Sequence, residues 1–249
     1  MKIFSKHSLA GKKILLTGAT GGIGAAIAHL TASCGAQLIL TARNESKLQQ
    51  ACAALPGENH LSHVADMCNH AALSNLVASL PKLDGVVYNA GILEWALCKR
   101  ISEEHVRTTM QTNFESIVML QGMLMKNKKI AGGASIVSIA SEAVFKPSIG
   151  QALYGASKAA LVAYTKALAL ELAPQKIRAN CVLPAMVQTD MATEGILDEQ
   201  QLEHLAQSYP LKRLGQPQDI ANLVTFLLSD AAEWMTGSSL VMDGGAQLV

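Results

Sequence analysis

Short runs of aliphatic and β-branched residues alternate with longer helical stretches along nearly all of the 249 residues. This alternation constrains the fold more than any other feature, because parallel strands need long crossover connections, which are usually helices. The pattern predicts helices at 22–33, 45–55, 70–80, 102–126, 152–173 and 217–229. It predicts strands at 13–17, 37–41, 60–65, 83–89, 134–139, 178–183 and 239–242.

The predicted fold class is α/β: a three-layer, doubly wound parallel sheet of about seven strands with helices on both faces. The composition agrees, since 50% of the residues are hydrophobic and only 4% are aromatic, and an aliphatic core suits strands that are buried on both sides. The length fits a single domain over 1–249. Ligands of such a sheet bind at the carboxyl ends of the strands, so the polar residues there are the candidates for function.

Charge and hydropathy argue against several other classes of protein. The formal net charge of +1 predicts no nucleic-acid partner, which would need clustered basic residues. No run of about 18 apolar residues predicts a membrane span, and the first residues lack the apolar run of about 7–15 residues that a secretory signal carries. Five cysteines without a Cys-x-x-Cys pair predict free thiols and a cytoplasmic location.

A glycine-rich segment follows the first predicted strand and opens the first predicted helix. Its residues are Thr17, Gly18, Ala19, Thr20, Gly21, Gly22, Ile23 and Gly24. Glycines let the backbone approach a pyrophosphate, whose oxygens bind the N–H groups and the positive dipole end of the helix. An ordinary tight turn is the alternative, but the place between a strand and a helix favours dinucleotide binding.

The end of the second predicted strand distinguishes between the two nicotinamide cofactors. NAD enzymes commonly carry an acidic residue there for the ribose 2′-hydroxyl, whereas this chain has Arg43. A guanidinium binds a 2′-phosphate that a carboxylate would repel. The sequence therefore favours NADP(H) over NAD(H), although Glu45 nearby speaks the other way and Arg43 as a solvated loop residue is the alternative.

Tyr154 and Lys158 lie four residues apart, on one face of the predicted helix 152–173. The ordinary pKa of a phenol is about 10, and a neighbouring ammonium favours the phenolate. Such a pair exchanges a proton with a carbonyl or alcohol oxygen. The spacing alone is common by chance, so the surrounding residues have to support this interpretation.

Three further segments carry polar groups to the same edge of the predicted sheet. Ser141 ends the fifth strand, Asn113 lies in the helix that follows the fourth strand, and that strand itself ends in Asn89, Ala90 and Gly91. In a doubly wound order these segments meet Tyr154 and Lys158 at the ligand-binding edge.

Taken together, these motifs resemble the short-chain dehydrogenase/reductase family from Gly11 to Gly245. The resemblance implies a Rossmann fold with strand order 3-2-1-4-5-6-7 and hydride transfer between a nicotinamide and a carbonyl or secondary alcohol. It implies a homo-oligomer, a tetramer rather than a dimer, which agrees with the apolar surface of helix 152–173.

The resemblance also implies roles for individual residues. Tyr154 would be the general acid/base, Ser141 would hold the substrate oxygen, Lys158 would bind the nicotinamide ribose and Asn113 would anchor a water of a proton relay. Further cofactor contacts are implied for Asp66, Met67, Asn89, Ala90, Gly91, Pro184, Val187 and Thr189. Ala185 departs from the family, which usually has glycine there, and Tyr88 replaces a frequent asparagine.

Within the family, the chain is most similar to 3-oxoacyl-thioester reductases, so a 3-oxoacyl thioester is one candidate substrate and another small ketone is the alternative. Those reductases dock an acidic acyl carrier protein on basic residues beside the pocket, and Lys126, Lys128 and Lys129 are the candidates here, but Leu170 stands where a second basic residue is expected. A solvated helix end, where positive charge suits the helix dipole, is the favoured interpretation of the three lysines. A substrate lid is predicted over 186–209, with apolar contacts from Met186, Met191, Ile196 and Leu197.

Other functions remain as alternatives. A catalytically silent dinucleotide-binding sensor or scaffold would not need Ser141, Tyr154 and Lys158 together, and a nucleotide-sugar epimerase would need a longer chain. A zinc site at His60, His63, Cys68 and His70 is disfavoured by the spacing; no metal is expected.

Overall fold

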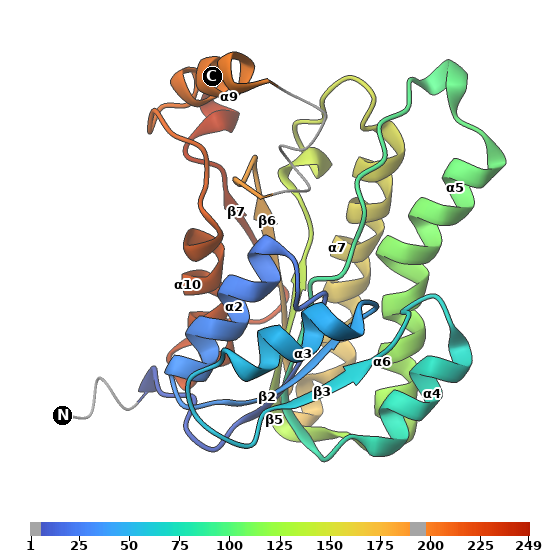
Figure 1. Cartoon of the computed structure of the whole chain (residues 1–249), viewed down its shortest axis with the longest axis vertical. Helices are drawn as coiled ribbons and strands as arrows, with labels where there is room; N and C mark the ends of the chain where they lie inside the picture. Colours follow the sequence, from blue (N-terminus) through green and yellow to red (C-terminus); the bar gives the residue numbers. More distant parts are fainter. Residues whose placement is uncertain (1–5, 190–197) are drawn as a thin grey trace.

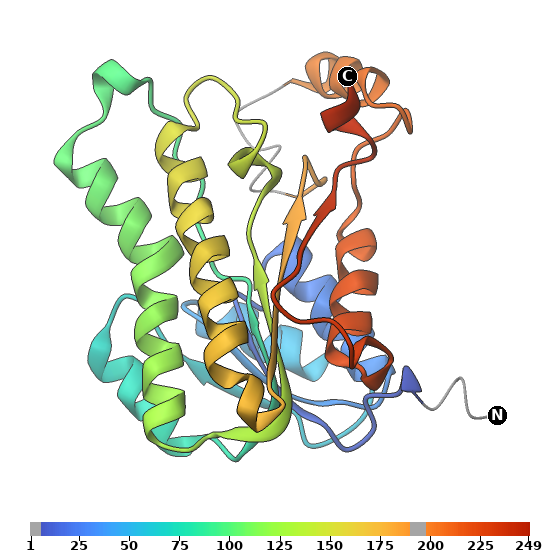
Figure 2. The ribbon, with the colours of Figure 1, turned by 180° about the vertical axis from the view of Figure 1, so that it is seen from behind.

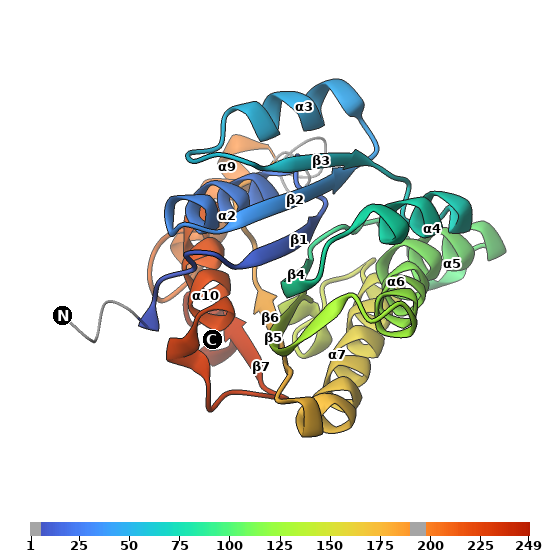
Figure 3. The ribbon, with the colours of Figure 1, turned by 90° about the horizontal axis from the view of Figure 1, so that it is seen from below.

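The computed structural model describes residues 6–189 and 198–249. Its described residues form one parallel sheet of seven strands in the order β3-β2-β1-β4-β5-β6-β7 (Figure 3), which confirms the predicted fold class and strand order. The strands are β1 (Lys13–Thr17), β2 (Gln37–Ala42), β3 (Leu61–Val64), β4 (Leu83–Tyr88), β5 (Ile130–Ile139), β6 (Arg178–Pro184) and β7 (Ser239–Met242).

Helices cover both faces of the sheet and form the outer two layers. Helices α2 (Gly22–Ser33), α3 (Glu45–Ala53) and α10 (Pro217–Leu228) pack on one face (Figure 1). Helices α4 (His70–Ser79), α6 (Ser116–Lys126) and α7 (Ala152–Leu172) pack on the other, where the green and yellow helices of Figure 2 lie. Each interface has its own aliphatic cluster, as expected for strands buried on both sides.

Three elements differ clearly from the sequence prediction. Helix α9 (Glu199–Ser208) lies in the segment 186–209, for which the sequence predicts a substrate lid but no helix. The predicted helix 102–126 is continuous but irregular: α5 (Glu103–Met110) joins α6 through a π-helical turn at Gln111–Glu115. Strand β5 begins at Ile130, earlier than predicted, because residues that include the glycine pair Gly132 and Gly133 continue the strand through a register shift against β4. Glycine-rich strands give a weak hydrophobic pattern, which explains the late prediction.

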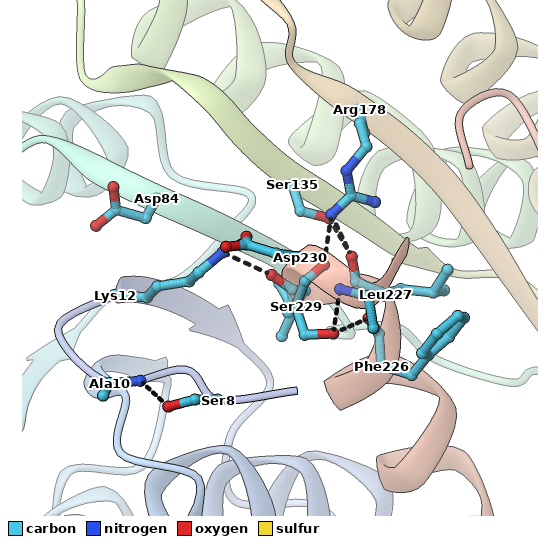
Figure 4. A network of polar contacts seen from close by, with 12 residues as sticks. Ser8, Ala10, Lys12, Asp84, Ser135, Arg178, Phe226, Leu227, Ser229 and Asp230 are labelled. Atoms are coloured by element: carbon cyan, nitrogen blue, oxygen red, sulfur yellow. Dashed lines mark hydrogen bonds and ion pairs between the residues drawn. The ribbon is translucent and has the colours of Figure 1, made fainter. Parts of the chain in front are cut away.

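The amino edge of the sheet, opposite the ligand-binding edge, is held to helix α10 by a network of polar contacts, partly buried and partly exposed (Figure 4). The Arg178 guanidinium donates to the carbonyl oxygens of Leu227 at 2.7 Å and Ser229 at 3.2 Å, where helix α10 ends. The Lys12 Nζ donates to the Asp230 carboxylate at 2.6 Å. Cations at a helix C-terminus satisfy carbonyls that have no partner within the helix and complement its dipole, so this network anchors α10 to the sheet.

Among residues 6–189 and 198–249, no helix combines the length and apolarity that a bilayer crossing requires. Within the same ranges, no cluster of three or more His, Cys, Asp or Glu side chains is arranged for a metal ion. His60 instead accepts a hydrogen bond from the backbone N–H of Leu38 at 3.1 Å.

Candidate active site

A pocket of about 640 Å³ lies at the carboxyl ends of the strands. Its lining comes from segments that follow β1, β2, β3, β4, β5 and β6, and from the first turns of α7. Three of the predicted site residues, Thr17, Ala19 and Asn113, are completely buried behind the lining. The others line the pocket: Gly18, Thr20, Gly21, Gly22, Ile23, Gly24, Arg43, Asp66, Met67, Asn89, Ala90, Gly91, Ser141, Tyr154, Lys158, Pro184, Val187 and Thr189.

The glycine loop needs glycine at two positions for different reasons. Gly18 has a φ of +65°, and a Cβ there would lie 2.8 Å from Cα of Ala90. A Cβ on Gly24 would lie 2.1 Å from the carbonyl oxygen of Gly18, so helix α2 can approach the loop only without a side chain. Gly21 precedes α2 and no side chain caps the helix, which leaves N–H groups of the first turn for a ligand.

Thr17 holds the loop against the end of β4. Its Oγ1 accepts hydrogen bonds from the backbone N–H groups of Asn89 at 3.0 Å and Ala90 at 3.1 Å. The Asn89 amide in turn donates to the carbonyl oxygen of Gly18 at 2.9 Å. These contacts join the ends of β1 and β4, the two strands between which the chain order reverses, and where a doubly wound sheet opens its binding crevice.

The ends of β2 and β3 place charged side chains at the same pocket. Arg43 is exposed and lines the pocket together with Lys47 from the first turn of α3. Glu45, the residue that argued against NADP(H), is not part of the lining, and its carboxylate accepts a hydrogen bond from Gln49 at 3.1 Å. The Asp66 carboxylate accepts the backbone N–H of Cys68 at 2.9 Å.

Asn113 lies in the π-helical turn, and its side chain forms hydrogen bonds with other residues of the protein. It accepts the backbone N–H of Ile92 at 2.8 Å and donates to the carbonyl oxygen of Ile92 at 2.9 Å and to Oγ of Ser157 at 3.1 Å. A Cβ on Gly91 would lie 3.2 Å from both Oδ1 of Asn113 and Nζ of Lys158. The side chain therefore fixes the segment after β4 directly beside Lys158.

Ser141, Tyr154 and Lys158 come together on one wall of the pocket. Lys158 is buried, its Nζ donates to the carbonyl oxygen of Ile139 at 3.0 Å, and it lies 5.8 Å from the centre of the Tyr154 ring. The Ser141 hydroxyl accepts the N–H of Ala143 at 3.1 Å and faces Tyr154. Burial lowers the pKa of Lys158 to about 8 because it disfavours the charged ammonium.

The pKa of Tyr154 differs in direction from the sequence prediction. Burial raises it above the ordinary value, and the hydrogen bond with Ser141 opposes that rise. The spacing of Tyr154 and Lys158 predicted a lowered pKa, because it accounted for the ammonium and not for the desolvation of the phenol. Ser141 is therefore the group that favours the phenolate within the described structure.

Known proteins resemble this chain over nearly its full length. A family model described as enoyl-(acyl carrier protein) reductase matches residues 18–247. A 3-oxoacyl-[acyl-carrier-protein] reductase of Rickettsia felis is 36% identical over 97% of this chain and 99% of its own. The human dehydrogenase/reductase SDR family member 4 is 35% identical over 96% of this chain and 89% of its own.

Solved structures agree with the sequence relatives. A short-chain dehydrogenase/reductase from Brucella melitensis, described as glucose/ribitol dehydrogenase, has a TM-score of 0.90 and 32% identity, over 96% of this chain and 98% of its own. One from Serratia marcescens has a TM-score of 0.88 and 31% identity, over 96% of this chain and 99% of its own. The chain belongs to the short-chain dehydrogenase/reductase family. It is thus an oxidoreductase of the kind that acts on CH–OH and C=O groups.

The pocket of this short-chain dehydrogenase/reductase contains polar residues that the motifs did not single out. They include Lys47, Glu142, Lys146 and Gln151. Glu142 directly follows Ser141 in the sequence, which is the only signal that pointed to it. The other three come from a helix turn and a loop, which a strand pattern does not reveal. Tyr209, after α9 (Glu199–Ser208), lines the pocket at the end of the predicted lid segment.

The basic residues considered for carrier-protein docking do not border this pocket. Lys126 ends α6, and Lys128 and Lys129 lead into β5 at the amino edge of the sheet. Lys129 donates to the carbonyl oxygen of Leu80 at 2.5 Å, which closes the end of α4. These lysines thus lie away from the pocket, which speaks against their use in carrier-protein docking, because the strand that follows them runs toward the pocket from the far side.

Proposed function

We propose that this protein is an NADP(H)-dependent ketoreductase that interconverts a carbonyl compound and the corresponding secondary alcohol. The observation that carries the proposal is the grouping of Ser141, Tyr154 and Lys158 on one wall of a pocket whose other half is the glycine loop. The family supports the reaction class, and several relatives of the chain are named 3-oxoacyl-[acyl-carrier-protein] reductases.

The pocket fits a dinucleotide phosphate. Gly18 and Gly24 let the loop pack closely against the end of β4 and against α2, because a Cβ at either position would clash with protein backbone, and the uncapped N-terminus of α2 opens beside the loop. Arg43 and Lys47 supply two cations at the end of β2, without a carboxylate from Glu45 in the lining, as a 2′-phosphate requires. Asp66 and Met67 would border the adenine, and Pro184, Val187 and Thr189 would border the nicotinamide.

When bound, NADPH supplies the hydride to the carbonyl carbon. Ser141 holds the carbonyl oxygen, and Tyr154 donates its phenolic proton to that oxygen as negative charge develops there. A phenol with a raised pKa is protonated at neutral pH, which suits the reductive direction. Lys158 stays near the end of β5 through its bond to Ile139 and would bind the ribose hydroxyls. The Asn113 side chain holds the segment that follows β4. We propose that the backbone of Asn113 binds the water of the proton relay.

The substrate half of the pocket is formed in part by the predicted lid. Met186, Leu205, Ser208 and Tyr209 line it, whereas the predicted contacts Met191, Ile196 and Leu197 lie outside the described residues. Small ketones and 3-oxoacyl thioesters are the proposed substrates. We further propose a homotetramer, since Leu170 on α7 and Met119 on α6 expose apolar side chains that a second subunit would cover.

The test is an NADPH-oxidation assay over 3-oxoacyl thioesters, cyclic ketones, quinones and keto-sugars, repeated with NADH. Arg43→Ala should raise the KM for NADPH by about tenfold to a hundredfold, the usual cost of losing charge-assisted hydrogen bonds, and leave the KM for NADH nearly unchanged. The control is Arg100→Ala, another exposed arginine outside the pocket. Equal losses for both cofactors would contradict the NADP(H) assignment, and no oxidation with any carbonyl would contradict the ketoreductase.

A further inference from the structure

The segment that follows β7 forms part of the pocket wall. Its residues Ala246 and Val249 line the pocket, and Ala246 opens the short 3-10 turn η6 (Ala246–Leu248). Lys146 lines the same pocket from the loop that follows Ser141. Ala246 packs with Tyr209, one of the residues that form the substrate half of the pocket. The loop and the segment therefore meet beside the substrate half.

The Lys146 side chain connects the loop to this segment. Its Nζ donates to the carbonyl oxygen of Ala246 and, at 2.7 Å, to that of Val249. Carbonyls at the end of a helical turn have no partner within the turn, so an ammonium that reaches them satisfies groups that would otherwise need water. Because all three residues line the pocket, the connection runs across one side of its substrate half.

The attachment depends on this one side chain. Within the described part of the chain, Lys146 makes the only hydrogen bonds between 141–151 and 243–249. The other bonds of the segment are local, since the Asp243 carboxylate accepts the N–H groups of Gly245 and Gln247, each at 2.9 Å. These local bonds shape the turn but do not attach it to the loop.

Like charges on the two segments oppose the attachment. Burial and the neighbouring Asp243 raise the pKa of Glu142 to about 7, and Lys146 opposes the rise. Glu142 belongs to the loop and Asp243 to the segment after β7, so their carboxylates repel each other across the junction when both are ionised. Loss of the Lys146 ammonium would remove both hydrogen bonds and the cation that offsets this repulsion.

We propose that Lys146 is a positioning residue that fastens the Ala246–Val249 segment across the substrate half of the pocket, and that this closure favours compact ketones over ketones with a bulky substituent. A substituent that extends past Lys146 has to displace the segment and break the bonds that hold it. This inference rests on the proposed ketoreductase function and narrows its substrate class by size.

The experiment compares two methyl ketones, butanone and 4-phenylbutan-2-one, which is butanone with a phenyl group on its fourth carbon. The quantity measured is the ratio of kcat/KM for the phenyl ketone to kcat/KM for butanone, with NADPH. It is measured in the wild type, in Lys146→Met, which cannot donate, and in Lys146→Arg, which can. Lys129→Met is the matched control, because Lys129 also donates to two carbonyls, those of Ala78 and Leu80, but away from the pocket.

We expect the ratio to rise by about threefold to tenfold in Lys146→Met, the usual effect of losing one hydrogen bond. It should stay the same in Lys146→Arg and in Lys129→Met. Butanone fits within the closed pocket, so Lys146→Met should still reduce it. Lys146 is exposed, and its substitution should leave the fold intact.

A second measurement needs neither cofactor nor substrate. Hydrogen exchange of the unliganded protein, followed by mass spectrometry at short times, should be faster by about threefold or more in peptides that cover 246–249 of Lys146→Met than in the wild type. The same peptides should exchange at the wild-type rate in Lys146→Arg and in Lys129→Met. Peptides from the sheet should keep their protection in all variants.

The outcomes that overturn the inference are distinguishable from a failure of the proposed function. Unchanged exchange at 246–249 in Lys146→Met shows that Lys146 does not hold the segment. Faster exchange with an unchanged ratio of the two ketones shows that the segment does not select for size, while the ketoreductase function stands. If the wild type reduces other carbonyls of the screen but not butanone, the compact substrate class is wrong. If it oxidises NADPH with no carbonyl, both proposals fail together.

Discussion

The two edges of the sheet use the same kinds of side chain in opposite ways. At the amino edge, Arg178 and Lys12 are fully engaged with the carbonyls and the carboxylate at the end of α10 (Figure 4). At the carboxyl edge, Lys158 is buried with a lowered pKa and Glu142 has an unpaired oxygen. The first arrangement pairs both cations with groups of the protein, whereas the second leaves one carboxylate oxygen without a hydrogen-bond partner among the described residues.

The same strands therefore contribute to the stability of the fold at their amino ends and to the pocket at their carboxyl ends. Strand β6 begins at Arg178 in the amino-edge network and ends at Pro184 in the pocket. A group that is satisfied within the fold stabilises it, and a group held ready for a ligand destabilises the unliganded protein. Substitutions at the two edges should therefore change different measurements, and the following predictions test that separation.

The largest effect is expected at the carboxyl edge. Tyr154→Phe should lower turnover by about 10³-fold, because the proton donor is lost, while NADPH affinity and the melting temperature stay nearly the same. Steady-state kinetics, cofactor titration and thermal unfolding measure the three quantities. Tyr164→Phe, on the same helix but packed against Phe114, is the control and should retain its turnover. Retained turnover in Tyr154→Phe would remove the assigned mechanism.

At the amino edge the effect should fall on stability alone. Arg178→Met removes a charged donor from the buried carbonyls of Leu227 and Ser229, which keep only the Ser135 hydroxyl at 2.8 Å and the Ala232 N–H at 3.3 Å. We expect a loss of about 1–3 kcal/mol in the free energy of unfolding. Chemical denaturation measures this loss, with the exposed Arg100→Met as control. The kcat of the folded variant should be unchanged, and a fall in kcat without a fall in stability would refute the separation.

A smaller effect is expected for Lys158→Met, and it is a gain in the free energy of unfolding instead of a loss. Burial lowers the pKa of Lys158 from 10.5 to about 8, so below about pH 8 the folded protein holds a charge that the unfolded chain accommodates more easily. As pH rises from about 8 to 10.5, the folded lysine is neutral while the unfolded one is still charged, and stability increases.

Lys158→Met should thus be inactive but more stable than the wild type by about 1–2 kcal/mol at pH 7, after allowance for the lost bond to Ile139. The advantage should disappear by about pH 10.5. Denaturation at several pH values measures it, and Lys166→Met on the exposed side of α7 provides the comparison. A stabilisation that does not depend on pH would point to packing in place of charge.

The sequence predicts the sheet and its order because aliphatic runs and helical stretches alternate with little ambiguity. Strands β1 and β7 have the predicted boundaries, and the glycine loop lies where its motif indicates. The π-helical turn could not be predicted, since its residues continue the helical pattern without a break. Within this turn, the Asn113 side chain accepts the backbone N–H of Ile92, a residue 21 positions away in the chain, and such a distant contact leaves no local signal.

The residues of the candidate site were also only partly predictable from the sequence. Motifs identify residues that chemistry requires at a fixed spacing, such as Tyr154 and Lys158. They do not identify Lys47 or Lys146, which line the pocket from segments without a motif, nor Glu142, whose only signal is its place next to Ser141. Nor do they give the direction of the pKa of Tyr154, which depends on how much water the folded pocket excludes.

The π-helical turn at Gln111–Glu115 has a consequence for insertions and deletions. A π turn holds one residue more than an α turn, and each residue turns an α-helix by about 100°. Deleting one residue from this segment would restore regular hydrogen bonding, but it would swing α5 around its axis and carry Asn113 away from Ile92. The helix therefore tolerates changes in residue type far better than changes in length, and single-residue gaps here should be selected against even where they would make the helix more regular.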